Sequence, residues 1–81
     1  MDIVLKHILE EQEKLVKASE DFVAFNNTHS REESIEYANR IRKEFHYVWT
    51  LNTYNHKEAH KIKEGMMELL LGYKYFVEGK D

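Results

Sequence analysis

The chain has 81 residues, no cysteine, no proline and a formal net charge of −3 at pH 7. A chain of this length forms one small domain whose core leaves little room for a deep pocket. The lack of cysteine excludes disulfides and thiolate metal sites, so oligomerisation is the easiest remaining source of extra stability. No stretch approaches the roughly 20 apolar residues of a membrane span, and the first residues do not form a signal peptide. We therefore expect a cytoplasmic protein with no membrane partner.

The first predicted helix covers about residues 2–25. Apolar residues recur there at alternating spacings of three and four, which is the period of one helix face. This face contains Val4, Ile8, Leu15, Ala18, Phe22 and Phe25, and an adjacent row contains Leu5, Leu9, Val16 and Val23. Together they cover roughly half of the circumference, which predicts a helix that packs against two others.

A polar segment at 26–30 separates the first helix from the second. Ser30 followed by Glu33 matches a capping box, which predicts a helix that begins at Arg31. The apolar period continues to about residue 51, so the second helix is expected over 31–51. Its expected core residues are Ala38, Ile41, Phe45 and Val48, flanked by Tyr37 and Trp49.

Polar residues at 52–55 mark the second break. Asn55 followed by Glu58 matches an N-cap with an acid in the first helical turn, and Gly79 lies where a C-terminal glycine is expected. The third helix is therefore expected over about 56–78. Its expected core residues are Ala59, Ile62, Met66, Leu69, Leu70, Tyr73, Phe76 and Val77.

These three segments predict an all-α fold with a single domain, residues 1–81. Short loops make sequential helices antiparallel neighbours, so we expect an up-down-up three-helix bundle. The residues expected to form the shared core are Leu15, Phe22, Ile41, Phe45, Met66, Leu69 and Tyr73.

Candidate residues for catalysis or metal binding are few. His56, His60 and Glu64 are spaced four apart and could present two imidazoles and a carboxylate to a metal ion. Their stripe points away from the expected core, so we interpret both histidines as solvated. The serines match no histidine–acid arrangement, and no glycine-rich loop is present. We therefore expect no catalytic residue, no metal and no cofactor, in a protein that is not an enzyme.

The middle of the chain is basic although the whole chain is acidic. Residues 1–36 carry a net charge of −5, residues 40–63 carry +4, and residues 64–81 carry −2. Cations interleaved with aromatic residues, here Tyr47, Trp49 and Tyr54, are typical of nucleic-acid binding. The alternative function is therefore a small nucleic-acid-binding regulator that uses Arg40, Arg42, Lys43, Lys57, Lys61 and Lys63. These cations could instead pair with acids of the first helix or of a second subunit.

Glu11 and Gln12 interrupt the apolar arc of the first helix, one turn before Leu15. Two interpretations stay open. Glu11 lies at the edge of the arc and reaches solvent, or it forms a polar layer with a donor from another helix or chain. The second interpretation follows from the cost of burying a carboxylate without partners.

The third helix carries more apolar residues than one core face needs. Met67, Leu71 and Tyr75 recur every four residues on the other side, and Tyr47 lies outside the core arc of the second helix. A helix that is apolar all round is normally buried on more than one side. We expect these four residues to form a protein interface, in a homodimer built on the third helix or in a complex with another protein. The predicted function is a small non-enzymatic protein–protein interaction module, which acts as a regulator, inhibitor or adaptor.

Overall fold

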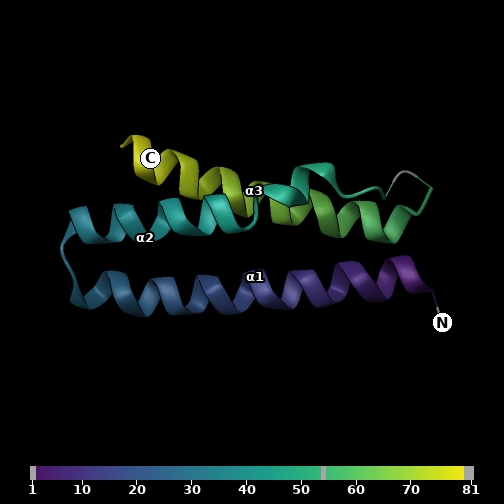
Figure 1. Cartoon of the computed structure of the whole chain (residues 1–81), viewed down its shortest axis with the longest axis horizontal. Coiled ribbons are helices and arrows are strands. Elements are labelled where there is room, and N and C mark those ends of the chain that lie inside the picture. Colours follow the sequence, from purple (N-terminus) through teal and green to yellow (C-terminus); the bar gives the residue numbers. More distant parts are fainter. Residues whose placement is uncertain (1, 54, 80–81) are drawn as a thin grey trace.

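The computed structural model describes residues 2–53 and 55–79, which form helices and no strand. The elements are α1 (Ile3–Thr28), α2 (Arg31–Glu44), a 3-10 helix η1 (His46–Thr50) and α3 (Lys57–Glu78). Figure 1 shows α1 along the whole length of the molecule, and each of the three long helices packs against the other two. The all-α fold class is therefore confirmed. No helix among the described residues is long and apolar enough to cross a membrane.

The break between α1 and α2 lies later than predicted. Helix α1 continues through the polar residues 26–28, because side chains at its end satisfy its last carbonyl groups. The Thr28 hydroxyl donates to the Phe25 carbonyl oxygen at 3.2 Å, and the His29 ring nitrogen Nδ1 lies 2.9 Å from the same oxygen. The predicted capping box is confirmed, since Ser30 and Glu33 each bond to the backbone N–H of the other.

The second predicted helix is divided in two, so its expected continuity to residue 51 is wrong. Helix α2 ends at Glu44, and Phe45 has backbone angles outside the α region before η1 begins. Aromatic and β-branched residues, which are weak helix formers, fill this segment. A 3-10 helix has three residues per turn, so Phe45, Val48 and Leu51 share one face. Phe45 and Val48 are buried and Leu51 packs against the core, which explains the tighter turn.

The core lies where the three helices meet. Phe22 of α1 makes edge-on ring contacts with Tyr37 of α2 and with Tyr73 and Phe76 of α3, at centroid distances of 5.8, 5.1 and 5.4 Å. Six of the seven residues expected in the shared core are buried, and the exception is Leu69. The buried apolar residues are Ile8, Leu15, Phe22, Ala38, Ile41, Phe45, Val48, Ala59, Met66, Leu70 and Tyr73.

Two expectations about buried faces are wrong. Leu69 is 38% exposed, whereas its neighbour Leu70 is only 2% exposed and takes the core position. The wide apolar arc predicted for the first helix is also narrower in the structure. Val4 and three members of the adjacent row, Leu9, Val16 and Val23, are exposed, because α2 and α3 cover only one side of α1.

Candidate protein-interaction groove

An open groove of about 600 Å³ lies between α2 and η1 on one side and α3 on the other. Its apolar lining residues are Trp49, Leu70 and Leu71. Its polar lining residues are Asn39, Arg42, Lys43, His46 and Lys74. The groove therefore combines an apolar surface with a cluster of cations.

The local fold explains why the cations gather there. Arg42 and Lys43 occupy the last turn of α2, where positive charge interacts favourably with the helix dipole. The Arg42 guanidinium is oriented by a 3.3 Å hydrogen bond that it donates to the Asn39 side-chain oxygen. Lys74 of α3 lies one turn after Leu70 and Leu71, so it is placed beside the apolar lining. His46 stacks on Trp49 within η1, with ring centroids 6.2 Å apart.

The charge of the groove is one-sided. No aspartate or glutamate lines it among the described residues. Neither Lys43 nor Lys74 forms an ion pair with another residue in 2–53 or 55–79. Such a surface favours a ligand that offers both an apolar group and carboxylates or phosphates.

The residues predicted to form an interface are not equivalent. Leu71 lines the groove and is partly exposed, and Tyr75 is largely exposed outside it. Met67 is partly buried and packs against the core, so it does not lie on the side of α3 opposite the core as the sequence predicted. Tyr47 keeps part of its ring exposed but donates its hydroxyl hydrogen to the Glu11 carboxylate.

Glu11 forms a buried polar contact between α1 and η1. It is only 8% exposed, so the interpretation in which it reaches solvent is wrong. It accepts hydrogen bonds from the Tyr47 hydroxyl and, at 3.3 Å, from the Lys14 ammonium. The bond from Tyr47 is the main reason that the pKa of Glu11 lies below its ordinary value. Burial, and then the bond to Glu11, raises the pKa of Tyr47.

The six cations of the alternative hypothesis do not form one surface. Arg42 and Lys43 lie in the groove, whereas Lys57 and Lys61 line a separate depression beside Glu58, His60 and Glu64. Arg40 stacks over the Tyr37 ring, with its guanidinium carbon 5.1 Å from the ring centroid. Lys63 is used internally, since its ammonium donates to the Leu51 carbonyl oxygen at 2.6 Å. Tyr54 lies outside the described residues.

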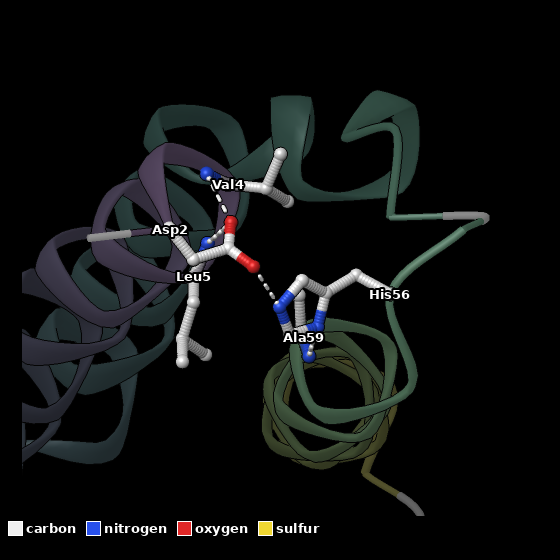
Figure 2. A network of polar contacts seen from close by, with 5 residues as sticks. All are labelled: Asp2, Val4, Leu5, His56 and Ala59. Carbon is white, nitrogen blue, oxygen red and sulfur yellow. Dashed lines mark hydrogen bonds and ion pairs between the residues drawn. The ribbon is translucent and has the colours of Figure 1, made fainter.

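His56 has a structural role that the sequence interpretation missed. Figure 2 shows its ring between the N-terminal end of α1 and the N-terminal end of α3. Its Nδ1 accepts a 3.2 Å hydrogen bond from the Ala59 backbone N–H, which makes His56, and not Asn55, the N-cap of α3. Its Nε2 contacts the Asp2 carboxylate, which itself caps α1 by accepting from the backbone N–H groups of Val4 and Leu5. These contacts lower the pKa of Asp2, and the bond from the Leu5 N–H is the largest cause.

The histidine stripe is divided between different partners. His60 contacts the Glu64 carboxylate at 3.2 Å and the Thr53 hydroxyl at 3.1 Å, while His56 turns toward Asp2. Within 2–53 and 55–79, no three histidine, aspartate or glutamate residues are grouped as a metal site.

This difference gives a matched pair of variants. His56→Ala removes the cap of α3 and is expected to lower the free energy of unfolding by about 1 kcal/mol, as the loss of other N-caps does. His60→Ala is expected to lower it by less, because His60 caps no helix and its ion pair with Glu64 is exposed, so that only its part-buried contact with the Thr53 hydroxyl is lost from the interior. Urea unfolding of both variants measures the difference, and equal losses would contradict the capping role.

A second exposed apolar surface lies on α1, on a side that neither α2 nor α3 covers. Leu9, Val16 and Val23 are 44%, 46% and 58% exposed. Their spacing of seven residues places them on one face of the helix. Their apolar character predicted burial, but the acids Glu13 and Glu20 between them are typical of an exposed face.

No protein-family model, curated protein or solved structure matches this chain. Functional inference therefore depends on the geometry and charge of these surfaces.

Proposed function

We propose that the chain is a small, cytoplasmic, non-enzymatic protein–protein interaction module, and that the groove lined by Trp49, Leu70 and Leu71 is its docking site. The observation that carries this proposal is a cluster of cations beside an apolar surface, in which Lys43 and Lys74 form no ion pair with another residue in 2–53 or 55–79. The preferred partner surface is an apolar helix face that carries carboxylates. A role as a regulator, inhibitor or adaptor agrees with a small helical domain that would act by binding through its surface.

The charge of the groove also bears on the homodimer expected from the sequence. In the up-down-up arrangement proposed for the bundle, a two-fold axis near Leu71 would place the groove against its own copy. Arg42, Lys43 and Lys74 would then face the same three cations, which is unfavourable at close range. This argument favours a contact between the groove and an acidic surface over a symmetric contact through α3.

The test compares two substitutions one helical turn apart. Leu71→Glu places an acid inside the groove, whereas Tyr75→Glu places one on the same helix outside it. The partner is first captured on the immobilised wild-type chain. We expect Leu71→Glu to bind this partner about tenfold more weakly or worse, and Tyr75→Glu to bind it as the wild type does. Circular dichroism must show that both variants fold.

Other outcomes discriminate between the proposed surfaces. Equal loss with both variants would assign the interface to the row of Met67, Leu71 and Tyr75 expected from the sequence. An unchanged affinity with both would exclude α3 as the docking surface.

A second candidate function is nucleic-acid binding, because Arg42, Lys43 and Lys74 lie beside the exposed Trp49 ring. Cations next to a ring on which bases can stack suit a single strand. Titration of a mixed-sequence single-stranded oligonucleotide tests this candidate. Binding that weakens steeply with salt and is lost with Lys43→Glu would support it, and absence of binding at low salt would exclude it.

A further inference from the structure

The exposed face of α1 is the second unpartnered apolar surface of this chain, and its chemistry is opposite to that of the groove. Leu9, Val16 and Val23 follow each other at about 10.5 Å along the helix axis, which is the rise of seven residues. Glu13 and Glu20 each lie four residues after a member of this row, so they flank it on the helix surface. We call these five residues the α1 face.

The acids of the α1 face are available for a partner. Glu13 and Glu20 are exposed, and neither forms an ion pair with another residue in 2–53 or 55–79. Lys17 is the neighbouring cation on the same helix, since it lies four residues after Glu13 and three before Glu20. Its ammonium pairs with Asp21 at 3.3 Å instead of with either glutamate.

A symmetric contact between two α1 faces is unfavourable. In an antiparallel pairing centred on Val16, Leu9 of one copy would lie against Val23 of the other. The same register places Glu13 beside Glu20 of the second copy, so like charges meet. Two copies of the α1 face would repel each other, and so would two copies of the groove. The α1 face and the groove, in contrast, have opposite charges and each offers an apolar surface to the other.

The two surfaces can be occupied at the same time because the α1 face lies on the side of α1 that α2 and α3 leave uncovered, whereas the groove lies between α2, η1 and the side of α3 that is turned away from α1. Phe76 faces α1, since its ring centroid lies 5.4 Å from that of Phe22. Leu71 instead lines the groove formed with α2 and η1. Contacts made through one surface therefore do not block the other.

We propose that the groove of one copy binds the α1 face of a second copy, so that the chain self-associates head to tail. This inference rests on the proposed function of the groove as a docking site, and it names a second copy of this chain as the occupant. A contact between two different surfaces is heterologous, and it generates a closed ring or an open chain of subunits instead of a two-fold dimer.

The test uses two variants that each disable one surface. Leu71→Glu disables the groove and leaves the α1 face intact, whereas Val16→Glu disables the α1 face and leaves the groove intact. Sedimentation velocity at low salt is expected to show concentration-dependent association of the wild type. Each variant alone is expected to be a folded monomer, with association weakened about tenfold or more.

An equimolar mixture of the two variants is the decisive sample. The intact α1 face of the Leu71→Glu chain can enter the intact groove of the Val16→Glu chain, so a 1:1 heterodimer is expected. It cannot grow further, because the remaining contact would place the two introduced glutamates against each other. Added salt is expected to weaken this heterodimer, since the Debye length falls from about 10 Å at 0.1 M to about 3 Å at 1 M.

Matched controls place an acid on the same helices outside both surfaces. Ile3→Glu on α1 and Tyr75→Glu on α3 are expected to self-associate like the wild type. The proposal would be overturned if Leu71→Glu abolished association and Val16→Glu left it unchanged, because the groove would then bind something other than the α1 face. A heterodimer that fails to form from two folded variants would overturn it as well.

Failure of this inference is distinguishable from failure of the proposed function. A wild type that stays monomeric at high concentration and low salt excludes the head-to-tail contact. The comparison of Leu71→Glu with Tyr75→Glu on a captured partner still decides whether the groove is a docking site for another protein.

Discussion

Leu70→Ala is expected to lower the free energy of unfolding by about 2–5 kcal/mol, and Leu69→Ala by less than about 1 kcal/mol. The two substitutions remove the same atoms from neighbouring positions of α3. Leu70 is 2% exposed, so its truncation leaves a cavity among the three helices, whereas Leu69 is 38% exposed and its loss opens no cavity. The difference therefore measures the rotation of α3 against the other helices.

Chemical denaturation with urea is the direct measurement. In a domain of this size, each 1 kcal/mol corresponds to a shift in melting temperature of about 4–8 °C. Leu70→Ala is therefore expected to melt well below the wild type, with Leu69→Ala close to it. A larger loss for Leu69→Ala would mean that α3 presents a different face to the core.

Helix ends could be predicted where a local motif determines them. Ser30 with Glu33 and the left-handed Gly79 act through bonds within a few residues, so the sequence alone reveals them. The cap of α3 could not be found this way. His56 is an uncommon N-cap, and its second partner, Asp2, is 54 positions away in the sequence.

Apolar periodicity located the core helices but not the width of their buried faces. Leu9, Val16 and Leu69 continue the apolar pattern, yet they lie where no third helix covers them. Burial there depends on how the helices cross, which is a property of the packed molecule. The groove could not be predicted for the same reason: Lys74 joins Arg42 and Lys43 only because α3 lies against α2.

Tyr47→Phe is expected to lower the free energy of unfolding by about 1–3 kcal/mol at pH 7, because it leaves the buried Glu11 carboxylate without its main donor. The ring stays in place, so packing changes little. Tyr75→Phe is the matched control, since Tyr75 is exposed and makes no hydrogen bond with another described residue. A loss below about 0.5 kcal/mol for Tyr47→Phe would mean that Lys14 or water replaces the phenol.

The same pair predicts how stability depends on pH. In the folded chain the Tyr47 bond, more than any other contact, lowers the pKa of Glu11 from its ordinary value of 4.5. A carboxyl whose pKa is lowered on folding stabilises the folded state above its unfolded pKa. That stabilisation is lost as the pH falls through the lower, folded pKa. Tyr47→Phe removes the largest cause of the shift, so it removes most of this pH-dependent stability.

The wild type and Tyr47→Phe are therefore expected to differ most near neutral pH and to converge in acid. Urea unfolding of both proteins at a series of pH values from 7 down to 3 measures the difference in free energy. It should be constant above the ordinary pKa of Glu11 and shrink below it, because a protonated carboxyl no longer gains from the charge-assisted bond. A difference of the same size at every pH would show that the Tyr47 hydroxyl stabilises the fold independently of the charge on Glu11, and not through the ionised carboxylate.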